Sequence, residues 1–415
     1  RVLCASFMQP SADSFTTIKE ETGEERYQEV ETMGFNSSES DEDAAAVETM
    51  IIDFDPTEFE GLVTETQETS EGNLSDDSEF EKNNLYDPHV MEEKSTYGSY
   101  LQYSYAVKSH KGYFPFEPLK VNQDYTISCE DASTESLIFA VFDGHGEFGH
   151  FVSGCICHVF LQNLVSHTLW RSDVRTAAVE SLRRAERQCI RRYRMRTSLS
   201  GTTAVICIVR QERLVVLNVG DSRAILAVKD GNSFKAEELT RDHTPSLPEE
   251  KKRILAAGGR VFALHYEDGT KGPERVWIKG RNLPGLAMTR SLCDVVAHSV
   301  GVSSMPEITE RILTEDDRVL ILASDGLWQF ISSEEVVSIV QDCATSRQAV
   351  NRLCKASWKR WFDLEQVVDD TTIIVVFLGK ESERLRVSLQ TQDFSLRLYS
   401  NPSISPITSD RKSVV

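Results

Sequence analysis

The sequence predicts an α+β fold in which pairs of helices pack on antiparallel sheets. Short runs of apolar, β-branched residues indicate buried strands, and such runs recur between residues 103 and 378. They come in clusters separated by pairs of helical segments, without the regular strand–helix alternation that a parallel sheet needs. Two of the runs are joined by a polar turn of hairpin length at residues 210–213, and hairpins pair their strands antiparallel.

The first half of the folded region is expected to hold two strands followed by two helices. The strands cover residues 103–107 and 137–142, and the second is continuously apolar, as a strand buried on both faces would be. Residues 151–164 are apolar enough to form a buried helix. Residues 173–194 form an amphipathic helix with many arginines on its polar side, and Asp173 is placed to cap its start.

The second half is expected to add five strands and three helices. A helix at 248–257 begins with Pro and stops at a Gly pair, which matches the usual preference for these residues at helix ends. The other helices are expected near 333–342 and 346–361. The strands are expected at residues 203–209, 214–219, 224–228, 319–323 and 372–378.

The negative charge of the chain is concentrated at its N-terminal end. The 415 residues carry a net charge of −20, but residues 1–97 hold 26 Asp and Glu against 5 Lys and Arg, and the remainder holds 39 acids and 40 bases. We therefore expect an acidic, largely disordered region at 1–97, one folded domain at 98–380 and a Ser-rich flexible tail at 381–415. The balanced folded part gives no support to nucleic-acid binding.

Cysteine usage and hydropathy indicate an intracellular protein. The nine cysteines are scattered without CxxC pairs, so we expect reduced thiols and a cytoplasmic or nuclear location rather than a zinc cage or a disulfide framework. No apolar run reaches the ~18–20 residues that a membrane-spanning helix needs. The chain begins with Arg1 rather than Met, from which we expect a piece of a longer chain, and a lipidation signal upstream stays open.

Several aspartates stand at the ends of the apolar runs. Asp143, Asp221 and Asp325 each follow such a run, and Asp369 and Asp370 precede the last one. Carboxylates gathered at one end of a sheet suit hard divalent cations, which prefer oxygen ligands. The sequence therefore points to metal-assisted chemistry.

The tetrapeptide Asp143-Gly144-His145-Gly146 is the most informative of these corners. Its glycines allow a ligand to approach the backbone, the Gly144 carbonyl adds an oxygen ligand, and His145 could protonate a leaving oxygen. Taken alone, a tight glycine turn with an exposed His explains the tetrapeptide equally well, and ordinary turns explain the other corners one by one. Taken together the corners favour a metal site, because independent turns rarely supply four strand-end aspartates in one chain.

A longer series of stretches resembles the metal-dependent protein serine/threonine phosphatases of type 2C, the PPM family. The match covers about residues 100–380 in the family's order, and the approach to residues 122–124 looks most like plant and protist members. The matching stretches are Asn122-Gln123-Asp124, Val141-Phe142-Asp143-Gly144-His145-Gly146, Ser200-Gly201-Thr202-Thr203-Ala204, Asn218-Val219-Gly220-Asp221-Ser222-Arg223-Ala224, Leu239-Thr240-Arg241-Asp242-His243, Ala257-Gly258-Gly259-Arg260-Val261, Leu286-Ala287-Met288-Thr289-Arg290-Ser291-Leu292-Cys293-Asp294, Leu322-Ala323-Ser324-Asp325-Gly326-Leu327-Trp328 and Asp369-Asp370-Thr371-Thr372.

The resemblance implies a central antiparallel β-sandwich flanked by helix pairs, with two Mg²⁺ or Mn²⁺ ions at one end. It also implies a monomeric catalytic domain that acts on phosphoprotein substrates. A hydroxide bridging the ions would attack phosphorus, so no covalent nucleophile is needed. The implied metal ligands are Asp143, the Gly144 carbonyl, Asp325 and Asp369, with Asp221 at a third, weaker ion. The implied catalytic residues are His145, as general acid, and Asp124, which orients water, while Asp370 takes no part.

Three positions depart from the family's usual residues near these sites. Many members have a carboxylate where Gln123 stands, although an amide can still hydrogen-bond a water on the metal. The family's Asp for the third ion is Gln329 here, which leaves that ion open. The usual Gly before Asp294 is Cys293, a bulkier residue that could shift the nearby flap.

The residue that binds the substrate phosphate is not evident. Some animal members use an Arg at the position of Leu119, and Lys120 or Lys111 could replace it or could simply be solvated surface charges. Together with Gln123 and Gln329, this absence keeps a second interpretation open. The chain could be a pseudophosphatase, a binding module that recognises a partner without turnover.

Overall fold

The computed structural model describes residues 93–97, 102–117, 119–265 and 271–379. The expected C-terminal tail and nearly all of the expected N-terminal region lie outside these residues. One short strand, β1 (Glu93–Tyr97), falls inside the stretch for which we expected little order, and it pairs with β2 (Gln102–His110).

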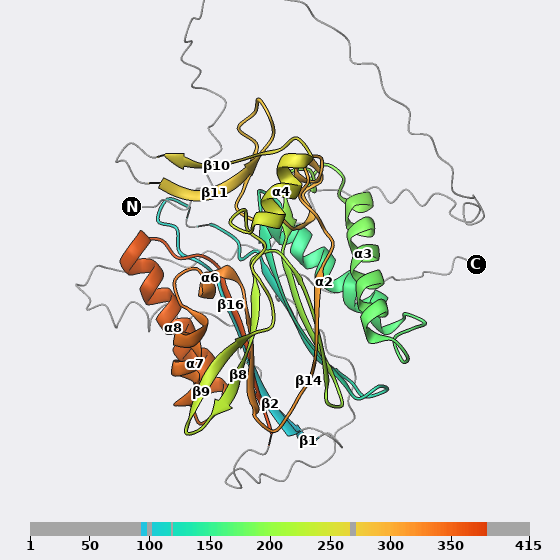
Figure 1. Ribbon diagram of the computed structural model, residues 1–415, viewed down its shortest axis with the longest axis vertical. Helices are drawn as coiled ribbons and strands as arrows, with labels where there is room; N and C mark the ends of the chain where they lie inside the picture. Colours follow the sequence, from blue (N-terminus) through green and yellow to red (C-terminus); the bar gives the residue numbers. More distant parts are fainter. Residues whose placement is uncertain (1–92, 98–101, 118, 266–270, 380–415) are drawn as a thin grey trace, which may run out of the picture. The chain divides into compact units, whose positions relative to one another are not determined.

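Two antiparallel sheets form the centre of the domain (Figure 1). The first sheet has the strand order β1, β2, β16 (Thr371–Leu378), β15 (Asp317–Ala323), β8 (Arg223–Asp230) and β9 (Ser233–Glu238). The second has the order β13 (Leu292–Cys293), β5 (Gly201–Thr202), β4 (Ser136–His145), β6 (Ala204–Arg210), β7 (Arg213–Val219) and β14 (Glu307–Ile312), with β3 (Asp124–Asp131) also paired to β4.

The sheets pack face to face through side chains that alternate along their strands. Phe139 and Val141 of β4 lie between the sheets with Leu320 and Leu322 of β15. Phe142, one position further along β4, lies on the opposite face against the helices. Because successive side chains of a strand point to opposite faces, a strand that is buried on both faces reads as one continuous apolar run. The predicted α+β sandwich is therefore confirmed.

Helix pairs cover both outer faces of the sandwich, as Figure 1 shows. Helices α2 (Gly149–Val165) and α3 (Val174–Arg192) pack on the second sheet, and α7 (Ser333–Gln341) and α8 (Ser346–Glu365) pack on the first. The Asp173 side chain accepts a hydrogen bond from the Thr176 backbone N–H, so the predicted N-cap is confirmed.

Two of the strands that the sequence did not predict are more polar than the predicted ones. They are β9, with the sequence SFKAEE, and β14, with EITERI. Both lie at a sheet edge, where one side is open to water and apolar alternation is not required. A small third sheet of β10 (Arg260–His265), β11 (Lys271–Trp277) and β12 (Pro284–Leu286) was also missed, and it lies near α4 (Pro248–Ala256) (Figure 1).

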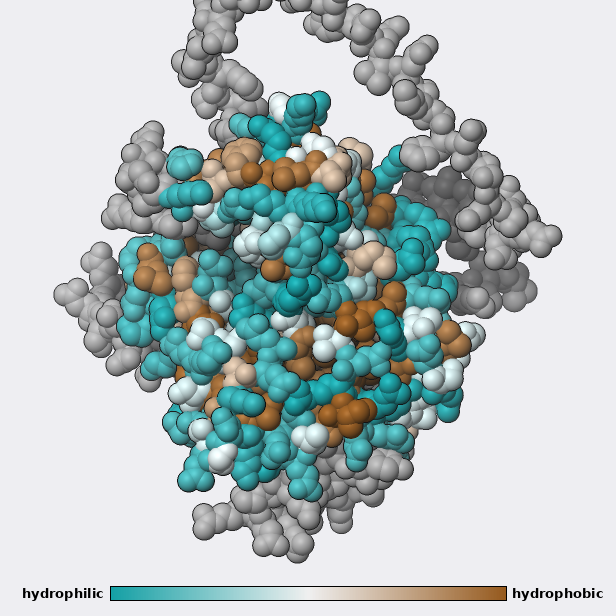
Figure 2. Space-filling model, in the orientation of Figure 1, coloured by the Kyte–Doolittle hydropathy of each residue, from teal (hydrophilic) through white to brown (hydrophobic). Residues whose placement is uncertain are grey.

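Figure 2 shows a mainly hydrophilic face on which hydrophobic residues stand in separate groups. Among the described residues, no helix is long and apolar enough to span a membrane. The eight cysteines of the described residues are all free thiols.

Candidate metal centre

The strand pairing brings the predicted acidic residues to one end of the sandwich. Asp124 and Asp143 are direct partners across the antiparallel pair of β3 and β4. Asp325 follows β15 at the first position of α6 (Asp325–Trp328), and Asp369 precedes β16, the strand that pairs with β15. The connection between the two sheets is direct, because the Ser324 hydroxyl donates to the Asp124 carboxylate at 2.9 Å.

Glycine is required at two of these corners because backbone atoms approach closely. A Cβ atom at Gly144 would lie 2.5 Å from the carbonyl oxygen of Gly149 and 2.6 Å from that of Gln123. A Cβ atom at Gly326, which follows Asp325, would collide with the Asp370 carbonyl oxygen. Any larger residue would push the neighbouring carboxylates apart, so these glycines keep the acidic segments together.

The carboxylates of Asp124, Asp143, Asp325 and Asp369, which we call the acidic cluster, repel one another inside a poorly solvated site. Burial, together with Asp124, Asp325, Asp369 and Asp221, raises the pKa of Asp143 well above its usual value. Burial and the charges of Asp369 and Asp221 raise the pKa of Asp325 in the same way. Protonation or a nearby cation therefore stabilises each of these carboxyl groups relative to an isolated negative charge.

Asp124 is the most buried member of this group. Burial and the charge of Asp370 raise its pKa to about 7, although the hydrogen bonds of Thr372 and Ser324 oppose the rise. Its Oδ1 atom is buried and has no hydrogen-bond partner among the described residues, and the same is true of Oδ1 of Asp221. Buried oxygens without a donor are the kind of group that a cation, or water bound to a cation, would satisfy.

The donor set fits Mg²⁺ or Mn²⁺ by its chemistry, because it consists of carboxylate and carbonyl oxygens. Within the described residues, no three His, Cys, Asp or Glu side chains stand as a finished cage around one point. The cluster is therefore a set of neighbouring donors whose charges oppose one another, and the ligand assignment stays a prediction.

Asp221 lies in the turn between β7 and β8, beside this cluster. Burial and the charge of Asp242 raise its pKa to about 6, while His145 and Arg275 lower it. Gln329, at the C-terminal end of α6, brings no negative charge to the neighbourhood. A third cation at Asp221 therefore stays open.

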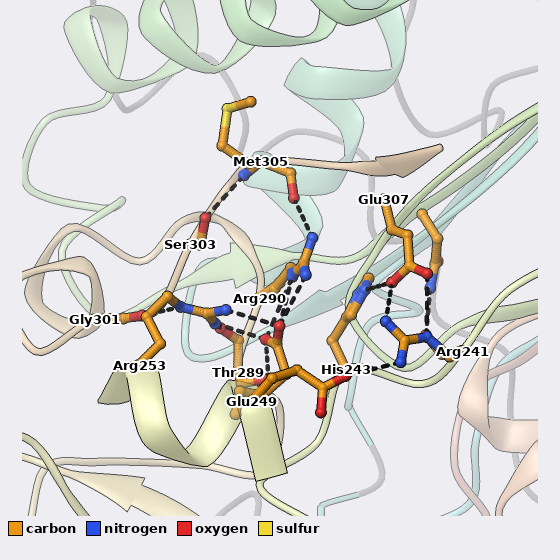
Figure 3. Close-up of polar contacts among 12 residues, drawn as sticks. Arg241, His243, Glu249, Arg253, Thr289, Arg290, Gly301, Ser303, Met305 and Glu307 are labelled. Atoms are coloured by element: carbon orange, nitrogen blue, oxygen red, sulfur yellow. Dashed lines mark hydrogen bonds and ion pairs between the residues drawn. The ribbon is translucent and has the colours of Figure 1, made fainter. Parts of the chain in front are cut away.

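His243, Glu307 and Arg241 form a network of polar side chains (Figure 3) that contacts the turn carrying Asp221 through the Gly220 backbone. The Gly220 backbone N–H donates to Nδ1 of His243 at 3.2 Å, so the Nε2 of this neutral ring carries the proton and donates to Glu307 at 3.1 Å. Burial and the charge of Arg290 lower the pKa of His243, which favours this neutral form. Glu307 in turn accepts two hydrogen bonds from Arg241, so residues outside the acidic cluster stabilise the turn.

His145 has a partner that the sequence did not reveal. Its Nε2 lies 2.5 Å from an Asp294 carboxylate oxygen, and the Asp294 side chain is 2% exposed. Burial lowers the pKa of His145, but the charge and hydrogen bond of Asp294 outweigh it, so the pKa is raised overall. The alternative of an exposed turn histidine is wrong, because only 19% of its side chain is exposed.

The backbone around Asp294 is arranged to bring its carboxylate to His145. Cys293 and Asp294 both have positive φ angles, 72° and 38°, a region that few residues other than glycine adopt. Gly201 lies opposite, where a Cβ atom would collide with the Asp294 carboxylate. The only sequence signal for this pair was that both segments belong to the stretches that resemble the phosphatase family.

Two further residues have structural contacts that the sequence did not predict. The Gln123 side-chain amide donates to the Gly146 carbonyl at 2.9 Å, so it braces the loop after His145. Asp370 is not a bystander, because its carboxylate binds Lys120 at 2.6 Å and two backbone N–H groups. Lys120 is therefore not a solvated surface charge, and Leu119 is 89% exposed without a charge to offer a phosphate.

Comparisons with known proteins show which family the chain resembles. The family model described as "Protein phosphatase 2C" matches residues 109–360. The chain is 35% identical over 295 residues to "Probable protein phosphatase 2C 35" of Arabidopsis thaliana, covering 67% of this chain and 84% of that protein. It is also 35% identical over 308 residues to "Probable protein phosphatase 2C 12" of Oryza sativa subsp. japonica, covering 62% and 78% of the two chains.

A solved structure shows a similar fold. The crystal structure of a serine-threonine phosphatase 2C from Toxoplasma gondii matches with a TM-score of 0.59 and 23% sequence identity, covering 70% of this chain and 99% of that chain.

Proposed function

Because this chain belongs to the protein phosphatase 2C family of protein serine/threonine phosphatases, we propose that its acidic cluster hydrolyses phosphoserine and phosphothreonine with Mg²⁺ or Mn²⁺. The observation that carries the metal dependence is Asp143, whose pKa is raised well above its usual value by burial and by four neighbouring carboxylates. Divalent cations would relieve this repulsion. The substrates are phosphoproteins, and a monomeric catalytic domain stays part of the proposal.

The proposed ligands of two cations are Asp143, the Gly144 carbonyl, Asp325 and Asp369. When bound, the cations would lower the pKa of an attacking water and stabilise charge on the phosphoryl oxygens. Asp124 would accept a hydrogen bond from water through its Oδ1, since Ser324 already donates to Oδ2 and no described residue donates to Oδ1.

The proposed proton donor to the leaving Ser or Thr oxygen is His145. With Nε2 held by Asp294, the nitrogen that is left for the substrate is Nδ1, which has no partner among the described residues. Asp294 stabilises the protonated ring, which is the form that a general acid needs. Alkoxide leaving groups require a proton, so this pair acts at the bond that breaks.

The comparisons give no support to a pseudophosphatase. The relatives are named as protein phosphatases, and every residue that the family resemblance assigned to the two-ion centre is present. The Gln123 amide hydrogen-bonds the loop after His145, so the residue that departs from the family still makes a structural contact at the site.

Turnover of a phosphothreonine peptide with Mn²⁺ tests the proposal. We expect hydrolysis by the wild-type chain, and a loss of at least about a hundredfold in Asp143→Asn, because second-shell changes alone typically cost 10–100-fold at metal sites. Asp316→Asn is the matched control, since Asp316 is an exposed residue away from the cluster. Equal turnover by Asp143→Asn and the wild type would overturn the assignment.

A further inference from the structure

An internal ammonium group lies against the acidic cluster. Lys120 is 7% exposed, and its Nζ lies 2.6 Å from Asp370 and 3.5 Å from Asp369. The same nitrogen lies 5.2 Å from the centre of the Phe114 ring. Burial opposes the charge on Lys120, but the two carboxylates outweigh it and raise its pKa, so the side chain stays protonated.

The partner of this ammonium joins two distant segments. The Asp370 carboxylate accepts hydrogen bonds from the backbone N–H of Gly112 at 2.7 Å and of Gln123 at 2.9 Å, in addition to its contact with Lys120. Both backbone donors come from the loop that leads into β3, while Asp370 leads into β16. One carboxylate therefore binds three donors of the same loop.

The two segments are also joined by their backbones. Tyr113 and Val368 exchange two hydrogen bonds of 2.8 Å, and a Cβ atom at Gly112 would collide with the Val368 carbonyl oxygen. The loop consequently lies directly on the segment that carries Asp369. The loop ends at Gln123, the residue before Asp124. The Gln123 carbonyl accepts a hydrogen bond from the Gly144 N–H at 3.2 Å.

We propose that Lys120 is a positioning residue. Through Asp370, it holds the carboxylate of Asp369 and the start of β3 at Asp124 in place before any cation binds. This inference rests on the proposed function, because Asp369 is a proposed metal ligand. The Lys120 charge is committed to two carboxylates, so it does not bind the substrate phosphate. It is instead a fixed positive charge built into one side of the acidic cluster.

Two electrostatic effects of Lys120 oppose each other, and the geometry decides between them. The ammonium repels an incoming cation, but it also holds two adjacent buried carboxylates in place. Without it, Asp369 and Asp370 would repel each other with no positive charge between them, and one of them would turn away. A cation would then have to reorder a ligand as it binds, so its affinity falls.

Calorimetric titration of the metal-free chain with Mn²⁺, without substrate, measures this effect directly. We expect Lys120→Met, which removes the charge and keeps the length, to weaken Mn²⁺ binding by about 10–100-fold, the range seen for residues that orient metal ligands. Lys120→Arg keeps the charge and should recover most of the affinity. Lys229→Met is the control, since Lys229 is an exposed residue at the end of β8.

Turnover separates positioning from a general loss of structure. At saturating Mn²⁺, Lys120→Met should regain a larger share of the wild-type kcat than it does at low Mn²⁺, because its ligands are present but poorly held. Mn²⁺ binding by Lys120→Met that equals or exceeds the wild-type affinity would overturn the inference. Should Lys120→Met not fold, Asp370→Asn carries the test, because it removes the same clamp and leaves every proposed ligand in place.

Mn²⁺ binding and peptide hydrolysis by the wild-type chain distinguish a failure of the proposed function from a failure of the role of Lys120. A wild-type chain that neither binds Mn²⁺ nor hydrolyses a phosphothreonine peptide contradicts the proposed function. A wild-type chain that does both, beside an Asp370→Asn variant of unchanged Mn²⁺ affinity, contradicts only the role of Lys120.

Discussion

Replacing Asp294 with Asn tests the proposed proton donor without touching a proposed metal ligand. The variant keeps the size of the side chain, and Asn tolerates the positive φ of 38° at this position better than most residues. It removes the negative charge that lies 2.5 Å from Nε2 of His145. The protonated ring then loses its stabilising partner, while Asp143 and the other carboxylates stay in place.

The expected size of the effect follows from the burial of this pair. A hydrogen bond between charged groups contributes about 1.5–3 kcal/mol, and the Asp294 side chain is almost fully buried, so solvent screens it little. Each 1.36 kcal/mol corresponds to a tenfold change in rate. We therefore expect kcat for a phosphothreonine peptide to fall by about 10–100-fold.

The assay compares two leaving groups at saturating Mn²⁺. A threonine alkoxide must be protonated as it leaves, whereas the nitrophenolate of p-nitrophenyl phosphate leaves without a proton. Asp294→Asn should therefore slow the peptide strongly and p-nitrophenyl phosphate only slightly. Equal losses on both substrates would indicate a structural defect, and no loss on the peptide would show that Asp294 does not assist the donor; either result refutes the reasoning.

Three further predictions concern the supports of the site and the core. Gly201→Ala should slow peptide turnover as Asp294→Asn does, because its Cβ would displace the Asp294 carboxylate; unchanged turnover would contradict the close packing of that carboxylate against Gly201. Phe142→Ala should lower the free energy of unfolding in urea by about 3–5 kcal/mol, because its ring is fully buried between sheet and helices, and a loss below about 1 kcal/mol would contradict that burial. Glu250→Gln should cost about 3–5 kcal/mol at pH 7, because it leaves the charges of Arg253 and Arg290 without a carboxylate. Burial raises the pKa of Glu250, but its donors lower it more, so its stabilisation is present above the unfolded value of about 4.3 and is lost as the pH falls below it. The wild type and Glu250→Gln should therefore converge in stability on acidification, and a constant difference down to about pH 3 would contradict this.

The elements with strong apolar patterns were predictable, and so were the aspartates attached to them. The runs before Asp143 and Asp325 are buried on both faces, so hydrophobicity alone locates these strands, although β4 continues through Asp143 to His145. Strand β3 carries Asp124 but alternates apolar residues with Thr, Ser and acids, so Asp124 was found only through the family resemblance.

The pairings between side chains were not predictable because they depend on contacts between distant segments. His145 and Asp294 are separated by 149 positions, and Asp294 follows a strand of only two residues. Asp369 and Asp370 are neighbours with different contacts, since one faces the acidic cluster and the other binds the loop around Lys120. No local pattern distinguishes the two.

The central claim is that the gathered carboxylates bind divalent cations on which turnover depends. A titration of Mn²⁺ into chelator-treated protein, with hydrolysis of a phosphothreonine peptide followed at each point, tests it most directly. We expect no turnover without the cation, a rate that rises as the cation binds, and neither binding nor turnover in Asp143→Asn. Turnover that persists in the presence of excess chelator, or that proceeds equally in Asp143→Asn, would contradict it.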